Sequence, residues 1–442
     1  MTPKELNRDS MTGQAIYNLA TQLWPLNRSL TGNGVRETLR LIQQQLPDLT
    51  IHEIPSGTPV FDWVVPDEWN VREAWIEDSN GYRIVDFANH NLHLVGYSIP
   101  VDRTLSLDEL QKHLHSLPDQ PDAIPYITSY YAPRWGFCMR HNDRLKLKPG
   151  EYRAYIDATL APGSLTYGEL LIPGVTEKEV FLSTYVCHPS MANNELSGPC
   201  VTAYLAKWLG DLPYRRHTYR IIFIPETLGS IAYLSRNLKH LKSHVIAGFN
   251  ITCVGDDRTY SYLPSRNGNT LSDHAALHVL KHLDPNFKRY SYLDRGSDER
   301  QYCAPGVDLP IATIMRSKYG KYPEYHTSLD DLALVTPQGL AGGFTAIRKA
   351  IEIIENNPVP QVTVLGEPQM GKRGLYSSLS AAPRDDTVKM MMDMLAYCDG
   401  RHTLLDIAEI IGRTAEELMP VYQQLNVQGL IVDLDTHERK AL

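Results

Sequence analysis

The sequence of 442 residues lacks the features that mark secreted, membrane-spanning or nucleic-acid-binding proteins. Its six cysteines form no C-x-x-C pair, which disfavours a disulfide framework or a thiolate zinc site. No stretch approaches the roughly 18 uncharged apolar residues of a membrane-spanning helix, and the polar start MTPKELNRDSMTG has no apolar core of a secretory signal. Lysine and arginine number 43 against 51 aspartate and glutamate, and this net charge of −8 disfavours a broad nucleic-acid or anionic-membrane surface. We therefore expect a soluble, cytoplasmic protein with no membrane partner.

The residues that are present predict about three domains, at roughly 150 residues each. Residues 160–358 alternate apolar strand candidates with amphipathic helical runs, which is typical of a mostly parallel sheet covered by helices on both faces. Residues 1–48 contain two helical stretches, whereas the aromatic-rich residues 49–159 predict a small α+β domain. Residues 359–386 are rich in Pro, Gly and Ser and are predicted to be a linker. Residues 387–442 predict three helices and a strand, which together describe a winged-helix domain.

Polar clusters follow three of the predicted strands. The strand EVFLSTYV leads to His188 and Glu195, YRIIFIP leads to Glu226, and LPIATIM leads through a loop to His326. The loops after the strands of such a sheet gather at one edge, so these side chains can converge on one cation. Imidazole and carboxylate groups suit Zn²⁺, which lowers the pKa of a bound water toward about 7, and a nearby glutamate can then take its proton. A single histidine is more often a core or capping residue, but three coincident clusters predict a metal-dependent hydrolase.

The order of these segments resembles the zinc-dependent aminopeptidase family typified by bacterial leucyl aminopeptidases. ANNELSG is similar to the family's A-N-D-D-x-S-G segment, and PETLGS to its Glu-Glu…Gly-Ser segment. GSDERQYCAPGVDLP is similar to its Ser-Asp-His…Gly-x-Pro segment, and YHTSLDDL to its closing His-Thr…Asp segment. The resemblance covers about residues 1–48 and 160–358 and implies that they form one zinc-exopeptidase-like core into which residues 49–159 are inserted. With this insertion and its tail, the whole chain resembles still more an uncharacterised aminopeptidase-like subgroup of bacterial proteins that often accompanies surface-polysaccharide genes.

Three positions depart from the family pattern, in which a His, a bridging Asp, a Glu, another Asp and a final His bind two zinc ions. Asn194 stands at the bridging position, Pro225 replaces the first residue of the Glu-Glu pair, and Thr252 replaces the later Asp. A neutral amide carries no charge to offset the repulsion between two dications. We therefore expect one zinc ion rather than two.

The resemblance and the strand-end pattern together assign roles to individual residues. We expect His188, Glu195 and His326 to bind the zinc ion, and Glu226 to act as the general base or as a fourth ligand. Glu195 could equally cap the helix that follows it. Three further residues could bind the metal or orient a ligand: Asn194, Asp298 and Asp330.

The aromatic residues of the insertion are candidates for a wall over the metal site, although they could simply form the core of a small domain. The expected substrate is a small peptide or an amide-bearing small molecule, such as an N-acylated sugar. The residues expected to bind it are Trp63, Tyr131, Trp135 and Arg295.

The acidic tail argues against a DNA-binding function. From Pro360 to Leu442 the chain has 8 Lys and Arg against 12 Asp and Glu. Its third predicted helix offers Glu416 and Glu417 where such modules usually contact phosphates. We expect the tail to contact protein, with a homo-oligomer as one outcome, and we do not expect a nucleic-acid partner. The competing hypothesis for the whole chain is a non-catalytic ligand-binding or regulatory protein with a degenerate peptidase site.

Overall fold

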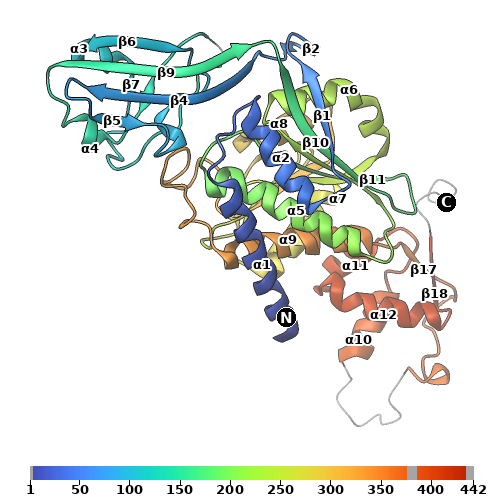
Figure 1. Cartoon of the computed structure of the whole chain (residues 1–442). Helices are drawn as coiled ribbons and strands as arrows, with labels where there is room; N and C mark the ends of the chain where they lie inside the picture. The colour runs from blue at the N-terminus through green and yellow to red at the C-terminus, as the bar shows by residue number, and fades with distance from the viewer. Residues whose placement is uncertain (1–2, 131, 376–385, 435–442) are drawn as a thin grey trace. The chain divides into compact units, whose positions relative to one another are not determined.

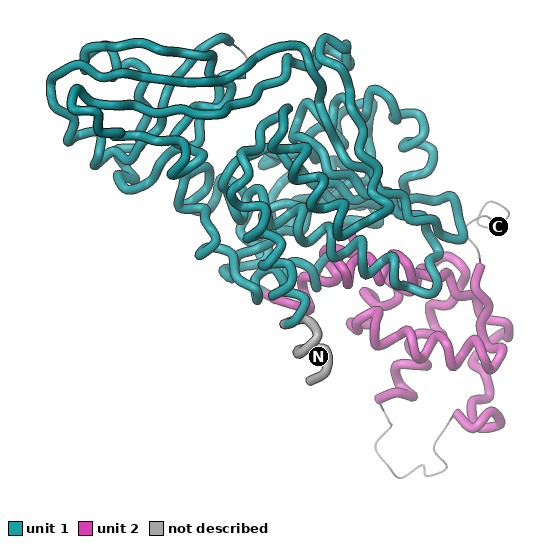
Figure 2. Tube along the Cα trace, in the orientation of Figure 1, with its two compact units in different colours: residues 1–273, 286–347 teal, residues 274–285, 348–442 magenta. Residues whose placement is uncertain are grey.

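The computed structural model describes residues 3–130, 132–375 and 386–434. They form two compact units, one comprising residues 1–273 and 286–347 and the other residues 274–285 and 348–442 (Figure 2). Among the described residues, none of the helices is both long enough and apolar enough to cross a membrane.

An eight-stranded sheet, with the order β1-β10-β12-β11-β13-β16-β14-β15, lies at the centre of the first unit (Figure 1). Its four middle strands run parallel: β11 (Glu179–Tyr185), β12 (Thr218–Ile224), β13 (Val245–Asn250) and β16 (Ile311–Met315). The remaining strands are β1 (Thr50–Pro55), β10 (Ser164–Ile172), β14 (Ser261–Leu263) and β15 (Lys288–Arg289). Every residue of β11 is buried, as expected for a strand covered on both faces. The predicted mostly parallel α/β core is confirmed.

Helices cover both faces of this sheet: α1 (Pro3–Leu23), α2 (Asn33–Gln45), α5 (Ser197–Asp211), α6 (Leu228–His244) and α8 (Glu299–Tyr302). Successive side chains of a strand point to opposite faces. In β11, Ser183 contacts α8 through a 2.7 Å hydrogen bond between its hydroxyl and that of Tyr302. Thr184 points to the opposite face and lies against Gly198 of α5. A Cβ atom added at Gly198 would come within 2.5 Å of Oγ1 of Thr184. Two further helices, α7 (Leu271–Leu283) and α9 (Pro337–Glu355), each contain residues of both units.

Between β1 and β10 the chain forms a second, four-stranded antiparallel sheet with the order β5-β4-β9-β6 (Figure 1). Its strands are β4 (Glu68–Asp78), β5 (Arg83–Asp86), β6 (Val101–Ser106) and β9 (Glu151–Ala161). Four short strands form two separate pairs: β2 (Pro59–Val60) with β3 (Trp63–Val64), and β7 (Leu114–His115) with β8 (Phe137–Cys138). Two one-turn helices complete this region: α3 (Leu107–Leu110) and α4 (His141–Arg144). Residues 50–55, which we assigned to the insertion, pair with β10 in the large sheet.

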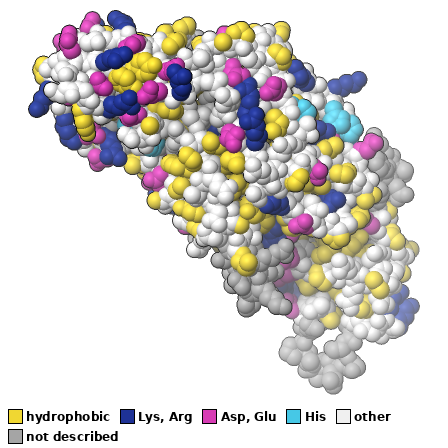
Figure 3. All heavy atoms as spheres, in the orientation of Figure 1, with side chains coloured by type: hydrophobic (Ala, Val, Ile, Leu, Met, Phe, Trp, Pro, Cys, Tyr) yellow, Lys and Arg dark blue, Asp and Glu magenta, His cyan; other side chains and the backbone are white. Residues whose placement is uncertain are grey.

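The surface of the four-stranded sheet is a mixture of hydrophobic side chains and charged side chains of both signs (Figure 3). Trp75 lies beneath two guanidinium groups, those of Arg83 at 4.8 Å and Arg153 at 5.4 Å from its ring centroid. Arg83 pairs with Glu73 at 3.0 Å, and Arg153 pairs with Asp102 at 2.8 Å. Part of the aromatic content of the insertion therefore stabilises its own surface.

The second unit contains the predicted winged helix. Its elements are β17 (Pro360–Val362), α10 (Asp386–Leu395), α11 (Leu404–Ile411), α12 (Ala415–Val427) and β18 (Ile431–Asp433). The strand β17 lies inside the predicted linker and pairs with β18, and residues 376–385 of that linker lie outside the described residues. Thr414 and Glu417 form a capping box at the start of α12.

Candidate metal centre

The three polar clusters lie where the sequence places them, beyond the carboxyl ends of parallel strands. His188 follows β11, Glu226 follows β12 and His326 lies in the loop after β16. Nε2 of His188 lies 3.6 Å from Oε2 of Glu226, and the rings of His188 and His326 lie 5.7 Å apart. The structure therefore brings together an imidazole, a carboxylate and a second imidazole from three separate loops.

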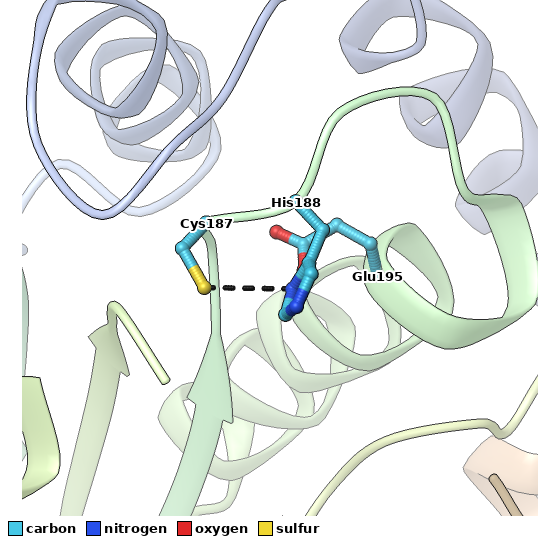
Figure 4. A group of neighbouring side chains, drawn as sticks. All are labelled: Cys187, His188 and Glu195. Atoms are coloured by element: carbon cyan, nitrogen blue, oxygen red, sulfur yellow. Dashed lines mark hydrogen bonds and ion pairs between the residues drawn. The ribbon is translucent and has the colours of Figure 1, made fainter. Parts of the chain in front are cut away.

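Glu195 contacts the opposite side of the His188 ring. It lies in a single π-helical turn, Ala192–Leu196, that opens α5, and its Oε2 lies 2.8 Å from Nδ1 of His188 (Figure 4). The thiol of Cys187 lies 3.5 Å from the same nitrogen. Behind this pair, the buried Arg28 donates from Nε to the carbonyl oxygen of His188 at 2.9 Å and lies 3.7 Å from Oε1 of Glu195. These contacts fix both the position and the orientation of the imidazole.

Tyr126, from the loop region of the insertion, contacts both histidines. Its ring meets that of His188 edge-on at 5.3 Å and that of His326 at 5.1 Å. Its backbone N–H donates to the carbonyl oxygen of His326 at 2.9 Å, next to a β-bridge between Pro125 and Thr327. His326 has a φ of 56°, an uncommon backbone conformation for a residue other than glycine. The insertion therefore helps to position a histidine of the core.

Burial is the main influence on the pKa values of His326 and Glu226. It lowers the pKa of His326 to about 3, with a further contribution from His188, so this imidazole is neutral near pH 7. It raises the pKa of Glu226, against the attraction of His188 and Arg300. A neutral imidazole offers a lone pair to a metal ion, and a carboxylate with a raised pKa accepts a proton more readily.

Asp298 fixes the backbone next to Glu226. Its Oδ1 accepts hydrogen bonds from the N–H of Thr227 at 2.7 Å and from the hydroxyl of Ser230 at 2.8 Å. Thr227 has a φ of 64°, which is strained for a β-branched residue and persists only where its surroundings enforce it. Burial, and then the charge of Glu226, raises the pKa of Asp298 to about 8.

Asp330 contacts the π-helical turn rather than either histidine. Its carboxylate accepts from the backbone N–H groups of Asn193 at 2.6 Å and Asn194 at 3.0 Å, and from the hydroxyl of Tyr322 at 2.8 Å. Burial raises the pKa of Asp330 to about 6. This carboxylate therefore ties the loop after β16 to the turn that contains Glu195.

The donor set of the cluster fits a zinc ion. Asn194 donates from Nδ2 to the hydroxyl of Tyr185 at 2.7 Å, whereas its buried Oδ1 has no hydrogen-bond partner among the described residues. A buried acceptor without a partner is costly unless a cation or a water molecule satisfies it. Ligand atoms of Cys187, His188 and Glu195 also lie within 4.8 Å of one another. Two imidazoles with carboxylate and amide oxygens are donors that Zn²⁺ accepts.

A pocket with an empty volume of about 620 Å³, its open mouth included, adjoins the cluster. Its lining combines side chains of the insertion with those of the strand-end loops, among them Trp69, Tyr97, Tyr126, His188, Glu226 and Arg300.

The residues predicted to bind substrate lie elsewhere or outside the described part of the chain. Trp63 packs at the edge of the apolar core, and Trp135 stacks on His113 with their ring centroids 3.7 Å apart. The exposed Arg295 lies over the ring of Tyr292 at 5.0 Å. The pocket lining drawn from the described residues includes none of these three, and Tyr131 lies outside those residues.

Sequence reasoning did not identify Arg300 or Tyr126 as site residues. Arg300 stands two positions after Asp298, in a segment already singled out by its resemblance, and this proximity was a usable signal. Tyr126 gave no such signal, because its approach to the histidines depends on contacts with a loop about 200 residues further along the chain.

Comparisons with known proteins agree with this architecture. A family model described as "Domain of unknown function (DUF4910)" matches residues 17–357, and one described as "winged helix-turn-helix" matches residues 358–433. A protein of Clostridium acetobutylicum named "Putative polysaccharide biosynthesis protein with aminopeptidase-like domain" is 43% identical over 409 residues, which are 92% of this chain and 93% of that protein.

Solved structures extend the comparison to the fold. The crystal structure of a "putative peptidase" from Clostridium acetobutylicum is 40% identical, with a TM-score of 0.92 over 98% of this chain and 99% of that one. A zinc aminopeptidase from Bacillus subtilis is 13% identical, with a TM-score of 0.55 over 77% of this chain and 94% of that one. The predicted fold class and the resemblance to zinc aminopeptidases are confirmed.

Proposed function

The chain belongs to the family described as a domain of unknown function (DUF4910), and on that premise we propose that it is a peptidase-like hydrolase that cleaves an amide bond with the help of zinc. One observation carries this proposal. His188 is oriented by Glu195 through Nδ1, and its Nε2 faces Glu226 at 3.6 Å and the ring of His326. An oriented imidazole next to a carboxylate and a second imidazole is an arrangement suited to metal-assisted hydrolysis.

His188 and His326 are the residues that would bind the zinc ion, with Glu226 or the unpaired Oδ1 of Asn194 as a further donor. The 2.8 Å contact with Nδ1 supports a role for Glu195 in orienting His188 rather than in binding the metal through its own oxygen. The neutral side chain at position 194 favours one ion over two. When bound, zinc lowers the pKa of a coordinated water and polarises the carbonyl group of the amide.

Glu226 is the proposed general base. It accepts a proton from the attacking water and delivers it to the leaving amine nitrogen, which the raised pKa of its carboxyl group favours. Asp298 supports this role through its hydrogen bond to the backbone of Thr227, the residue after Glu226.

The substrate that we propose is a small peptide or an amide-bearing small molecule. The pocket beside the cluster has aromatic side chains, including Trp69 and Tyr97, on which a flat group or a sugar ring can stack. The name of the Clostridium acetobutylicum relative refers to polysaccharide biosynthesis, so an N-acylated sugar belongs in the first substrate panel.

Metal analysis and an amide panel test the proposal. We expect about one zinc ion per chain in the purified protein, and loss of that zinc in the double variant His188→Ala, His326→Ala but not in the surface variant His274→Ala. We expect hydrolysis of at least one aminoacyl amide or N-acyl sugar, and a fall of at least about 100-fold in kcat in Glu226→Gln. Folded protein without stoichiometric metal would overturn the zinc assignment. Hydrolysis that is equally fast in Glu226→Gln would overturn the role of the base, and a zinc-binding protein without hydrolysis would favour the non-catalytic alternative.

For the winged-helix unit we propose a contact with protein, including a second copy of the chain, rather than with DNA. Its helix α12 carries Glu416 and Glu417 in the first turn and no basic residue in the last. These carboxylates repel phosphate groups. We expect no shift of random duplex DNA at low salt, and light scattering of the full chain reports its oligomeric state.

A further inference from the structure

We propose that Arg300 selects substrates that carry a carboxylate group close to the hydrolysed amide. This inference rests on the proposed function and narrows its substrate class. Arg300 lies in α8 and lines the same pocket as His188 and Glu226. A cationic group in that position faces the part of a substrate that lies next to the scissile bond.

The guanidinium group of Arg300 has unused hydrogen-bonding capacity. Its Nη2 donates to Oγ1 of Thr227 at 2.5 Å, and its buried Nε has no hydrogen-bond partner among the described residues. A buried donor without a partner is costly, and a charged one is more so. The planar guanidinium fork matches the two oxygens of a carboxylate, which would bind at its remaining N–H groups.

The two carboxylates closest to Arg300 in the sequence accept hydrogen bonds from other groups. Glu299, the neighbour of Arg300 in α8, accepts from the hydroxyl of Tyr319 at 2.6 Å and from Nδ2 of Asn250 at 2.9 Å. Asp298 accepts from the backbone N–H of Thr227. Neither forms an ion pair with Arg300 in the described part of the chain. Arg300 attracts Glu226 and Asp298 but forms an ion pair with neither among the described residues, so its guanidinium fork stays open to a ligand.

The charge balance of the pocket favours a carboxylate over a phosphate. Glu226 lines the pocket and lowers its capacity for negative charge, and the attraction of His188, and then that of Arg300, opposes the rise in the pKa of Glu226. The other arginine of the lining, Arg28, is fully buried and lies beside Glu195. One available cation balances a monoanion, whereas a dianionic phosphate would leave a buried excess of negative charge.

The wall of the pocket formed by the insertion is rich in aromatic side chains, two of which are held by hydrogen bonds. Trp69 stacks on Tyr97 with ring centroids 5.5 Å apart, and the indole N–H donates to the carbonyl oxygen of Ser98 at 2.9 Å. The hydroxyl of Tyr97 lies 2.6 Å from that of Thr31. A substrate therefore meets a preformed aromatic surface and a cation, which together favour an amide with one apolar or flat group and one carboxylate.

Pairs of dipeptides and N-acetyl amino acids that differ only in Asp against Asn, or Glu against Gln, test this inference. Binding is measured by titration calorimetry on protein treated with EDTA, so that neither hydrolysis nor a metal–carboxylate bond contributes. In the unmodified chain we expect the acidic member of at least one pair to bind about tenfold more tightly. That ratio should fall to nearly one in Arg300→Gln and take an intermediate value in Arg300→Lys. It should not change in Arg289→Gln, which removes an exposed arginine on β15.

The same pairs are then followed as substrates of the zinc-loaded protein, where the acidic-to-neutral ratio of kcat/KM should change in Arg300→Gln mainly through KM. A purely structural role of Arg300 would lower activity toward both members equally and leave the ratio unchanged. A ratio near one in the unmodified chain, no binding of any pair, or a preference that survives in Arg300→Gln would overturn the inference. Carboxylate binding that depends on Arg300 without any hydrolysis would instead overturn the proposed function alone.

Discussion

Nδ1 of His188 donates a hydrogen bond to Oε2 of Glu195 at 2.8 Å, in a contact where the imidazole is 8% exposed and the carboxylate is fully buried. A histidine that donates through Nδ1 presents the lone pair of Nε2 on the other side of its ring. That side faces Glu226, and the same loop cluster contains His326. The pairing thus fixes both the tautomer of His188 and the direction in which it can bind a metal ion.

Replacement of Glu195 by glutamine should weaken metal binding without abolishing it. The amide keeps the volume of the side chain but loses the negative charge that makes His188 a more basic ligand, so we expect zinc affinity to fall by about 10- to 100-fold. Competition with a chelator of known affinity measures the change, and Glu37→Gln on the exposed side of α2 serves as the control. Loss of all zinc in Glu195→Gln would instead mean that Glu195 binds the ion directly, and unchanged affinity would contradict both roles.

Replacement of Asp330 by asparagine should destabilise the first unit. The substitution places an amide N–H₂ group or a poorer acceptor against the backbone N–H groups of Asn193 and Asn194 and removes a charged acceptor for Tyr322. We expect a loss of about 2–4 kcal/mol in the free energy of unfolding, measured with urea. Asp331→Asn, which affects a hydrogen bond to the N–H of Ala333, should cost less than about 1 kcal/mol. Equal effects of the two substitutions would contradict the assigned role of Asp330.

Because of the Arg36–Glu68 pair, the free energy of unfolding should decrease as the pH falls through the acidic range. Arg36, whose Nη1 donates to Glu68 at 2.8 Å, holds the pKa of that carboxyl group at about 2, below the ordinary value of 4.5. Because the folded-state pKa is the lower one, the contribution of Glu68 is fully present above about pH 4.5 and is lost as the pH falls toward 2. The difference in melting temperature between the unmodified chain and Glu68→Gln should therefore shrink as the pH falls through this range. A difference that stays constant would show that the carboxylate charge contributes nothing.

Replacement of His278 by alanine should loosen the start of α12 in the second unit. His278 is buried, and its Nε2 accepts a hydrogen bond from the backbone N–H of Ala415 at 3.0 Å while Nδ1 pairs with Glu409. Without this acceptor the N–H of Ala415 loses its partner, at a cost of about 1–3 kcal/mol. Hydrogen exchange of peptides from α12 should speed up in His278→Ala but not in His282→Ala. Equal protection in both variants would contradict the importance of this contact.

Several features of the fold and the site follow from local sequence. The apolar residues 180–182 of β11 predict a buried strand of a covered sheet, and His188 follows in the loop at its carboxyl end, where the polar groups of such a sheet gather. The capping box of Thr414 and Glu417 forms within four residues and needs no distant partner. Such patterns depend on interactions between residues that are close in the sequence, so they can be recognised without a structure.

The sequence by itself determined the covered parallel sheet, the winged helix and the ends of the strands at which His188, Glu226 and His326 stand. Only the tertiary structure decided that Glu195 contacts Nδ1 of His188 and that Tyr126 and Arg300 border the same pocket. The physical reason is the range of the contacts. Hydrophobic periodicity and capping act over a few residues, whereas the direction of a buried side chain depends on packing against segments far away in the chain.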